Sequence, residues 1–361
     1  MRVLHVITGL GIGGAEQQLR LLLPQMRHAT DSSVVTLTNP GPVADALRAD
    51  GVRVTHLGMR GNRDLAALPR LTRHIRHGGF DLVHTHLYRA CLYGRLAARL
   101  AGVRTVIATE HSLGATGIEG RPLSAGARAL YLAGERLGTA TVAVSDTVAR
   151  RLADWGVRPA RIRVVPNGID VGRFAFDARA RRAARRRLGI APDAYVVGAV
   201  GRLVAGKRFG TLIRAVARVP RARLLLVGEG EQRGRLERLA AECGAGDRVV
   251  CAGAVSGGLP ELLSAMDVFV STSADEAFGL AVVEALAAGL PVRYVACPAL
   301  DDLPPGEAPG ARRIGGSVAD VVAALDTGPG ERLPVPPAVH RYDIAHSARQ
   351  LLSLYHEASD R

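Results

Sequence analysis

The chain has 361 residues, of which 48% are hydrophobic, 22% charged and 4% aromatic. This length suits two domains that each bury a core, and the composition excludes a disordered, collagen-like or coiled-coil chain. Among the 47 basic and 33 acidic residues, which give a net charge of +14, Lys207 is the only lysine. Arg and Lys are interchangeable on most solvated surfaces but not where a compact ammonium meets a phosphate. We therefore interpret most arginines as solvated and single out Lys207.

Short β-branched segments alternate with amphipathic segments through the first half of the chain. The predicted strands are Val3–Thr8, Ser33–Thr38, Arg53–Leu57, Asp81–His84, Thr105–Thr109 and Thr139–Val144. The predicted helices include Ala15–Arg27, Leu65–Arg76, Arg89–Leu100 and Asp146–Trp155. This alternation predicts right-handed βαβ crossovers and a doubly wound parallel sheet.

The alternation restarts after an Ala/Arg-rich stretch. Val164–Asp170 is typical of a strand that ends in a turn, and the six arginines of Arg179–Arg187 indicate a solvated helix face, with an anionic-lipid or partner site as the alternative. The later predicted strands are Tyr195–Val200, Leu224–Val227, Val249–Cys251, Val268–Val270 and Val292–Val295, followed by a helical segment from His340 to Glu357. We therefore predict an α/β protein with two Rossmann-like domains, residues 1–170 and 171–338, joined near residues 170–190.

The charge distribution bears on possible partners. Residues 1–170 hold 22 basic and 12 acidic residues, whereas residues 171–361 hold 25 and 21. Basic residues without interleaved aromatics or a nucleic-acid motif exclude nucleic acid, which leaves an anionic substrate or membrane surface. Four cysteines without metal-ligand spacing indicate reduced thiols and a cytoplasmic protein. Because the N-terminal apolar run is short and no apolar run reaches about 18 residues, we expect neither a signal peptide nor a transmembrane helix.

A glycine-rich loop follows the first predicted strand. The segment Gly9–Gly14 satisfies G-x-G-x-x-G and leads into a helix, an arrangement that favours an anion. A nicotinamide dinucleotide also needs an acidic residue about 20 positions later. Leu37–Pro40, at the end of the second strand, contains none. We therefore favour a glycine-rich anion loop at an interdomain cleft over a dinucleotide site.

Histidines stand where two neighbouring strands should end. His84 and His86 close one strand, and His111 follows the next. Strand carboxyl ends face the ligand crevice in open α/β sheets. Because no third ligand has recognisable spacing, we favour polar lining or structural hydrogen bonding for His84 and His86 over a metal site. His111 can donate a hydrogen bond to a substrate hydroxyl, and the alternative is that it caps the loop.

The second half carries a candidate diphosphate site. Arg202 and Lys207 follow a buried strand, where a guanidinium fork, an ammonium and a helix start can meet phosphate oxygens. The alternative is a solvated pair at a helix start. Glu276 precedes a helix expected to begin near Gly279, and Glu284 lies among apolar residues of that helix, where ribose hydroxyls would be a suitable partner. The amides of Phe278, Gly279 and Leu280 are free to meet phosphate or sugar oxygens.

Taken together, these segments resemble the family 4 retaining glycosyltransferases, which have the GT-B fold of two Rossmann-like domains facing a cleft. The matching motifs in chain order are Gly13-Gly14-Ala15-Glu16, Thr109-Glu110-His111, Val165-Pro166-Asn167-Gly168-Ile169-Asp170, Gly201-Arg202-Leu203 with Lys207, Val227-Gly228-Glu229-Gly230, and Glu276 with Glu284 around Phe278-Gly279-Leu280. The resemblance covers most of the chain.

The resemblance implies roles for these residues. The second domain would hold the donor and the first the acceptor, on the side of Glu16, His84 and His86. The implied donor-binding residues are Gly13, Gly14, Arg202, Lys207, Glu276, Phe278, Gly279, Leu280 and Glu284. Arg202 and Lys207 would bind the diphosphate, Glu276 the sugar and Glu284 the ribose, while His111 would lie near the reacting carbon. Residues 339–361 would form a helix that crosses back to the first domain.

The implied chemistry is transfer with retention at the anomeric carbon, assisted by the departing diphosphate, so that the catalytic residues are His111, Arg202, Lys207 and Glu276. No D-x-D motif occurs, and we expect neither a metal nor a cofactor. The segment from Cys297 to Asp302 departs from the family pattern, so donor contacts from that region do not carry over.

We predict an enzyme that uses a UDP- or GDP-sugar in polysaccharide, glycolipid or natural-product biosynthesis. The basic first half suggests an anionic or lipid-linked acceptor at the inner face of the cell membrane. A nucleotide-sugar epimerase on a similar fold and a non-catalytic sugar-binding scaffold are the alternatives. The complete set of Arg202, Lys207, Glu276 and Glu284 argues against the scaffold.

Overall fold

The computed structural model describes residues 1–61, 64–115, 117–118, 121–122, 124–255, 257–328 and 330–360. It divides the chain into two compact units. The first unit consists of Met1–Gly168 and the segment from Ile344 onward, and the second consists of Ile169–Asp343. The chain therefore leaves the first unit after Gly168 and returns to it at Ile344.

A seven-stranded sheet, parallel in every pairing, forms the centre of the first unit. Its order is β3-β2-β1-β4-β5-β8-β9. The strands are β1 (Arg2–Ile7), β2 (Asp31–Thr36), β3 (Arg53–His56), β4 (Leu82–His86), β5 (Thr105–Glu110), β8 (Ala140–Ala143) and β9 (Ile162–Val164). A short antiparallel pair, β6 (Gly117–Ile118) and β7 (Arg121–Pro122), stands apart from it. The order reverses between β1 and β4, which makes their carboxyl ends the switch point of this sheet.

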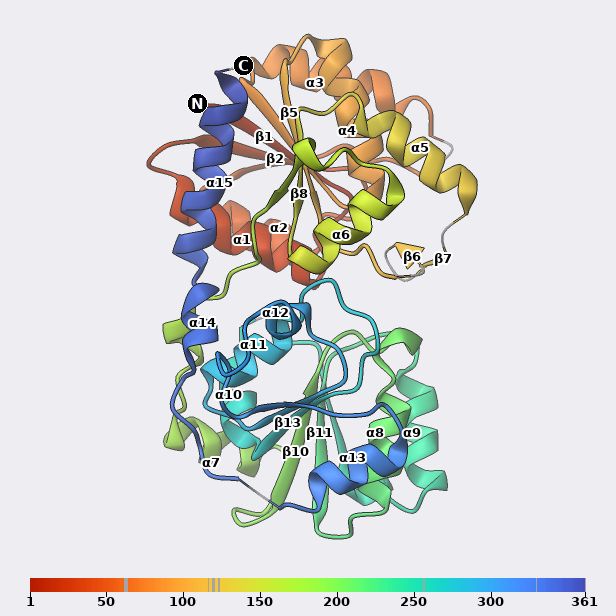
Figure 1. Cartoon of the computed structure of the whole chain (residues 1–361), viewed down its shortest axis with the longest axis vertical. Helices are drawn as coiled ribbons and strands as arrows, with labels where there is room; N and C mark the ends of the chain where they lie inside the picture. The colour runs from red at the N-terminus through yellow and green to blue at the C-terminus, as the bar shows by residue number, and fades with distance from the viewer. Residues whose placement is uncertain are drawn as a thin grey trace. The chain divides into compact units, whose positions relative to one another are not determined.

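Helices cover both faces of this sheet (Figure 1). They are α1 (Gly14–Met26), α2 (Gly41–Ala49), α3 (Ala67–Gly78), α4 (Tyr88–Ala101), α5 (Ala125–Glu135), α6 (Asp146–Trp155) and α15 (Ile344–Ser359), with the 3₁₀ turn Pro159–Arg161. Side chains alternate along β1, so Val3 and Ile7 pack toward α1, α2 and α15, whereas Leu4 and Val6 pack toward α3 and α4. His5 therefore shares the face of the sheet that α15 covers.

The second unit contains a six-stranded parallel sheet in the order β12-β11-β10-β13-β14-β15. Its strands are β10 (Tyr195–Val200), β11 (Ala222–Val227), β12 (Val249–Gly253), β13 (Val268–Ser271), β14 (Val292–Tyr294) and β15 (Ala311–Arg313). Here the order reverses between β10 and β13, so the switch point lies at their carboxyl ends.

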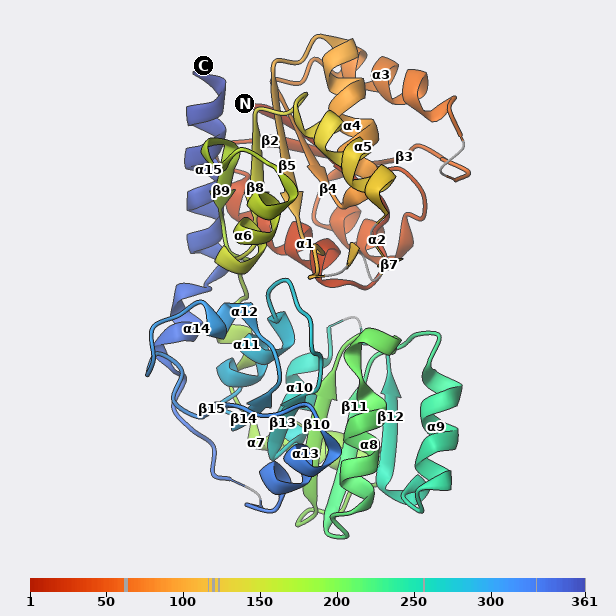
Figure 2. The same ribbon diagram turned by 45° about the vertical axis from the view of Figure 1, so that its right-hand side comes forward.

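The helices of the second unit also form two layers (Figure 2). They are α7 (Ala178–Arg187), α8 (Phe209–Ala217), α9 (Arg233–Glu242), α10 (Leu259–Ala265), α11 (Leu280–Ala287), α12 (Pro298–Asp301), α13 (Val318–Leu325) and α14 (Pro337–Arg341), with 3₁₀ turns at Val171–Phe174, Ala205–Lys207 and Gly246–Arg248. Apolar residues of α8, α9 and α13 pack on one face of the sheet in a single core. None of the helices in the described ranges is long and apolar enough to cross a bilayer.

The predicted pair of doubly wound parallel sheets is confirmed, and two local predictions need correction. The helical segment expected from His340 to Glu357 is broken at Tyr342-Asp343, so that α14 stays with the second unit while α15 packs beside α1 of the first. The strand β15 was not predicted, because Ala311–Arg313 contains no β-branched residue.

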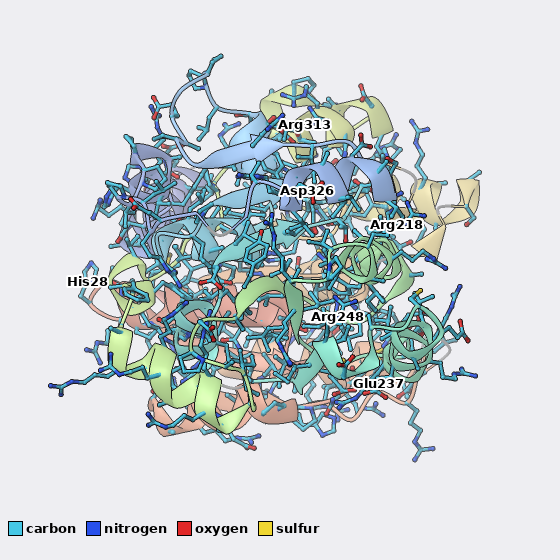
Figure 3. The ribbon with its side chains drawn as sticks, turned by 90° about the horizontal axis from the view of Figure 1, so that it is seen from below. His28, Arg218, Glu237, Arg248, Arg313 and Asp326 are labelled. Atoms are coloured by element: carbon cyan, nitrogen blue, oxygen red, sulfur yellow. The ribbon has the colours of Figure 1, made fainter. Side chains whose placement is uncertain are left out.

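Some arginines are structural rather than solvated. Arg181 and Arg185 of α7 both pair with Asp267, at 2.6 and 2.8 Å, and the Arg185 side chain is only 3% exposed. Arg248 donates to four backbone carbonyls at and after the end of α8, and Arg332 donates to four others. Only a guanidinium offers five donors in a fixed fork, so lysine could not replace these contacts. The solvated interpretation holds for residues such as Arg218, which is exposed in Figure 3.

Candidate active site

Two loops meet at the switch point of the second unit. One follows β10 and contains the 3₁₀ turn Ala205–Lys207, and the other follows β13. The buried hydroxyl of Thr272 donates to the Lys207 carbonyl at 2.8 Å, and the Ser273 hydroxyl donates to the Gly206 carbonyl at 3.4 Å. These bonds fix the second loop on the first, so the residues that each carries are held in register.

Lys207 and Glu276 are brought together by these loops. The Lys207 ammonium contacts the Glu276 carboxylate, and their side chains are 28% and 16% exposed. Both groups are therefore held in place yet accessible to a ligand. Arg202 lies on the same loop as Lys207 and is exposed. Lys207 ends its 3₁₀ turn rather than opening a helix as expected, because Arg208 adopts a left-handed conformation, φ 55°, before α8 begins.

The Gly228-Glu229-Gly230 motif packs against the backbone of the loop that carries Arg202. A Cβ on Gly228 would lie 1.9 Å from the carbonyl oxygen of Gly201, and one on Gly230 would lie 2.5 Å from that of Leu203. The Leu203 amide donates to the Glu229 carbonyl at 2.9 Å. These glycines therefore permit backbone to pack on backbone and so position the loop of Arg202 and Lys207.

The segment Phe278-Gly279-Leu280, whose backbone amides were predicted to meet a ligand, leads into α11. Gly279 is left-handed, φ 104°, and a Cβ there would lie 2.5 Å from the Cys297 Sγ. The Phe278 ring is buried edge-on against Tyr342, with ring centroids 5.0 Å apart. Among the described residues no carbonyl accepts the amides of Gly279 and Leu280. Backbone N–H groups, not the Phe278 ring, are what this segment offers a ligand.

Glu284 lies on α11 and is partly buried. Burial raises its pKa to about 7, an effect that the positive charge of Arg173 opposes. No hydrogen bond to the Glu284 carboxylate exists within the described ranges. Its two oxygens can therefore accept from hydroxyl groups, and the ribose contact expected for Glu284 stays a prediction.

The acidic side chain of Glu16 lies against the glycine-rich loop of the first unit. Gly13 caps α1, and a Cβ placed on it would lie 2.4 Å from Glu16 Oε2, while Gly14 is the first residue of the helix. The loop also packs on the turn after β2, where a Cβ on Gly41 would lie 2.4 Å from the Leu10 carbonyl oxygen. The Glu16 carboxylate therefore lies beside the N-terminal end of α1, and the anion site expected in this loop stays a prediction.

The histidines predicted on the acceptor side lie inside the first unit. His84 and His86 are 0% and 2% exposed. The ring nitrogens of His84 are engaged by the Tyr355 hydroxyl at 2.6 Å and by the Thr109 hydroxyl at 2.7 Å. His84 therefore cannot touch an acceptor, because the sheet and α15 enclose it. Structural hydrogen bonding, one of the two predicted interpretations, is what the structure shows for it.

His86 links two further histidines. Its Nε2 lies 3.1 Å from His5 Nδ1, and its Nδ1 lies 3.2 Å from His111 Nε2. Burial lowers the pKa of His5 to about 3 and that of His111 to about 4, and it holds the pKa values of His84 and His86 well below the ordinary value. All four rings are therefore neutral at pH 7. His5 and Tyr355 were not predicted, although a histidine inside the otherwise apolar strand β1 was a signal for His5.

The Pro166-Asn167-Gly168 motif marks the end of the first segment of this unit. The Gln18 side chain donates to the Gly168 carbonyl at 2.6 Å and accepts from the Gly168 amide at 2.8 Å. A Cβ on Gly168 would lie 2.6 Å from the Ile344 Cα. This motif therefore holds the end of the first segment of the unit against α1 and against the start of α15.

Known proteins are similar to this chain over both units. The sequence model described as Glycosyltransferase Family 4 matches residues 12–173, and the one described as Glycosyl transferases group 1 matches residues 180–301. A GDP-mannose-dependent alpha-mannosyltransferase of Mycobacterium tuberculosis is 34% identical over 296 residues, 78% of this chain and 75% of that protein. A 2-deoxystreptamine glucosyltransferase of Streptomyces kanamyceticus is 30% identical over 315 residues, 81% of this chain and 79% of that protein.

Solved structures share the fold. HepE of Anabaena, in complex with UDP-glucose, superposes with a TM-score of 0.86 at 22% identity, over 99% of this chain and all of that one. A UDP-GlcNAc 2-epimerase of Methanocaldococcus jannaschii superposes less well, with a TM-score of 0.64 at 12% identity, over 99% of this chain and all of that one. The fold therefore does not separate transferases from epimerases, whereas the sequence matches do. The chain belongs to glycosyltransferase family 4 and has the GT-B fold.

Proposed function

We propose that this enzyme transfers a sugar, with retention of anomeric configuration and without a metal ion, from a UDP- or GDP-linked donor to an acceptor hydroxyl. The observation that carries the proposal is the meeting of Lys207 and Glu276 at the switch point of the second unit. An ammonium suits a diphosphate and a carboxylate suits sugar hydroxyls, so the two groups match neighbouring parts of a nucleotide sugar.

Stabilisation of the leaving diphosphate would supply most of the catalysis. Lys207, Arg202 and the amides that open α11 all offer positive charge or N–H donors to phosphate oxygens, and such groups act where negative charge develops. Glu276 would accept hydroxyls of the transferred sugar, and Glu284 those of the ribose. His111, neutral at pH 7, would donate to the sugar. The absence of a D-x-D motif from the sequence supports a diphosphate held by groups of the protein without a metal ion.

Retention would follow from attack on the face that the diphosphate leaves. A diphosphate oxygen takes the proton of the acceptor hydroxyl while the bond from the anomeric carbon to the diphosphate breaks and the new glycosidic bond forms. The products are then the glycoside and a nucleoside diphosphate, and no side-chain nucleophile is needed.

The relatives leave the donor open between two bases. One is named for its dependence on GDP-mannose, and the HepE structure contains UDP-glucose. Thermal shifts with UDP, GDP, ADP and NAD, each with and without EDTA, would decide the base and the metal requirement. Stabilisation by UDP or GDP that EDTA does not reduce is expected, and stabilisation by NAD alone would refute the proposal. Product NMR would then report the anomeric configuration.

We further propose that the acceptor is lipid-linked and is met at an anionic membrane surface. The helices α3, α4 and α5 lie side by side on one face of the first unit, and exposed leucines gather there: Leu96 and Leu100 on α4 and Leu130 on α5. Exposed Arg73 and Arg76 stand on α3, and the Arg76 guanidinium donates to the Leu100 carbonyl at 2.7 Å. Leucine beside arginine suits an anionic bilayer surface.

Vesicle sedimentation tests this surface. Binding to phosphatidylglycerol vesicles, but not to phosphatidylcholine vesicles, is expected at low salt. The double substitution Arg73→Glu with Arg76→Glu should abolish it, whereas Arg218→Glu with Arg313→Glu makes the same charge change on exposed residues of the second unit (Figure 3) and should not. If the protein does not bind at low salt, a soluble acceptor, such as that named for the Streptomyces relative, becomes the better proposal.

An epimerase is not favoured, since the sequence relatives are glycosyltransferases. Such an enzyme would convert the donor sugar without any acceptor. Incubating donor alone and analysing the sugar would reveal it.

A further inference from the structure

We propose that Tyr342 and Cys297 are positioning residues for the donor diphosphate, because together they hold the Phe278 carbonyl so that the Gly279 N–H points at the phosphate oxygens. Both side chains are buried, so neither would touch the donor itself. The inference deepens the proposed function and rests on it for the identity of the ligand. The orientation of the Gly279 N–H does not depend on it.

The Phe278 carbonyl is anchored by the segment that follows β14. Its oxygen accepts from the Ala299 amide at 2.9 Å and from the Cys297 thiol at 3.4 Å. Burial holds the pKa of Cys297 well above its ordinary value, so the thiol keeps its proton and can donate. Phe278, Cys297 and Ala299 are 3%, 0% and 1% exposed. The anchor therefore lies inside the second unit, where solvent does not replace its hydrogen bonds.

Anchoring this carbonyl also sets the direction of the next amide. In a planar trans peptide unit the C=O and the N–H point in opposite directions. The Gly279 N–H therefore points away from Cys297 and Ala299. Among the described residues no acceptor exists for it or for the Leu280 N–H. Both N–H groups are left for a ligand, at the end of α11 that carries a partial positive charge.

Tyr342 contacts both sides of the anchor. Its hydroxyl donates to the Ala299 carbonyl at 2.6 Å, and its ring packs edge-on against the Phe278 ring. The side chain thus touches the residue whose carbonyl is held and the residue whose amide holds it. Loss of the hydroxyl would let the start of α12 move relative to Phe278, and the Gly279 N–H would move with it.

The turn that supplies the anchor is held by its own hydrogen bonds. Asp301 Oδ2 accepts from the Cys297 amide at 2.9 Å, and the Cys297 carbonyl accepts from the amides of Leu300 and Asp301, each at 2.8 Å. This turn lies in the segment Cys297–Asp302, which departs from the family pattern. Its role in the proposal is to act on the donor through Phe278 and Gly279.

The first experiment follows the Gly279 amide directly. Labelling phenylalanine with ¹³C at its carbonyl and glycine with ¹⁵N selects the amides of Gly210 and Gly279, the two glycines that follow a phenylalanine, and Gly210→Ala tells them apart. Inorganic diphosphate should shift the Gly279 signal of the wild type, and the shift should be smaller in Tyr342→Phe at the same concentration. A Gly279 signal that does not respond would overturn the proposal.

UDP and GDP, added to the wild type, separate this result from a failure of the proposed function. If one of them binds while the Gly279 signal stays unchanged, the inference fails and the proposed function stands. If neither binds, the proposed function fails, whatever the Gly279 signal does with inorganic diphosphate.

Dissociation constants then distinguish positioning from stability. Tyr342→Phe should weaken the binding of inorganic diphosphate by about fivefold, the effect of one hydrogen bond. Tyr195→Phe is the matched control, because the buried Tyr195 hydroxyl donates to the Leu325 carbonyl at 3.4 Å in the same unit. It should bind diphosphate as the wild type does, even if its melting temperature falls.

The thiol is tested by a matched pair. Cys297→Ala should weaken diphosphate binding, and Cys297→Ser should restore it, because a hydroxyl can donate to the Phe278 carbonyl in place of the thiol. Wild-type affinity in both Tyr342→Phe and Cys297→Ala would overturn the proposal. So would an equal loss of affinity in Tyr342→Phe and Tyr195→Phe, since it would show a general effect on stability.

Discussion

The Lys207 ammonium contacts the Glu276 carboxylate, and the two residues belong to loops that follow the neighbouring strands β10 and β13. In the proposed function they bind different parts of one donor, the diphosphate and the sugar. The ion pair therefore holds each group near the place where its ligand would arrive, and a bound nucleotide sugar would exchange this contact for two of its own.

Substitution of either residue should remove activity and spare the fold. Lys207→Ala and Glu276→Ala are each expected to lower kcat by about 100-fold or more, the usual cost of removing a group that stabilises developing charge. Lys207→Arg should be strongly impaired as well, because a planar fork does not fill the place of a compact ammonium. Transfer rates and melting temperatures check this, with exposed Arg218→Lys as the control. Full activity of Lys207→Arg would disprove the role given to Lys207.

Close backbone packing behind the Arg202 loop gives a stability prediction. Gly228→Ala places a methyl group 1.9 Å from the Gly201 carbonyl oxygen, at φ 143°. The free energy of unfolding should fall by about 3 kcal/mol or more. Gly234→Ala, on α9 with nothing within 4 Å, should raise it by up to about 1 kcal/mol because alanine is the better helix former. Urea denaturation measures both, and similar effects of the two substitutions would contradict the packing argument.

The four buried histidines predict instability in acid. Burial lowers the pKa values of His5, His84, His86 and His111. Between pH 6.5 and about 4 the unfolded chain therefore binds more protons at these histidines than the folded chain does. Stability should therefore fall as pH drops below 6.5. Glu284 has the opposite effect on stability. Its pKa is raised to about 7, so in this pH range the folded chain binds a proton at Glu284 that the unfolded chain does not bind.

Half-buried His74, whose pKa burial also lowers, acts in the same direction, so the free energy of unfolding should fall with a clear slope as the pH drops from 6.5 to 5.5. Urea denaturation at pH 7.5, 6.5 and 5.5 measures it. Exposed His28, replaced in His28→Gln, provides a control that should leave the slope unchanged. A stability that does not vary across this range would show that the four rings are not neutral in the folded protein.

Glu284 should make nucleotide binding depend on pH. Ribose hydroxyls donate best to an ionised carboxylate, and the pKa of Glu284 is raised to about 7 by burial. Affinity for the nucleoside diphosphate is expected to rise between pH 6 and pH 8, and Glu284→Gln should remove that part of the rise. Calorimetric titrations of both proteins would show it, and identical pH profiles would exclude Glu284 from the ribose site.

The same shift predicts an effect of Glu284→Gln on stability. At pH 8 the wild-type carboxylate is ionised in a partly buried site, which lowers the free energy of unfolding by no more than about 3 kcal/mol. At pH 4 the carboxyl group is protonated in the folded and the unfolded chain, so it has almost no effect on that free energy. The substitution should therefore raise the melting temperature at pH 8 more than at pH 4. An equal change at both pH values would indicate a packing effect.

Local patterns in the sequence predicted most strands because most of them contain a short apolar run between polar turns, as Tyr195–Val200 shows by matching β10 residue for residue. The positions of Lys207 and Glu276 were predictable for the same reason, since both follow predicted strands. The partners of His84 were not, because Tyr355 lies 271 residues away and only the return of α15 brings it there. Phe278 and Arg185 show the same limit. Both side chains are buried, and the residues next to them in the sequence do not predict that burial.

The return of α15 has a consequence for biosynthesis. The second unit is an insertion between β9 and α15, so the ribosome finishes Ile169–Asp343 before the first unit has all of its parts. Domains usually fold from the N-terminus as they emerge. Here the second unit can fold first, because the hydrogen bond between His84 and the Tyr355 hydroxyl cannot form until Tyr355 has left the exit tunnel. The polar interior of the first unit would thus stay open during translation, and its closure would be the last step in making the enzyme.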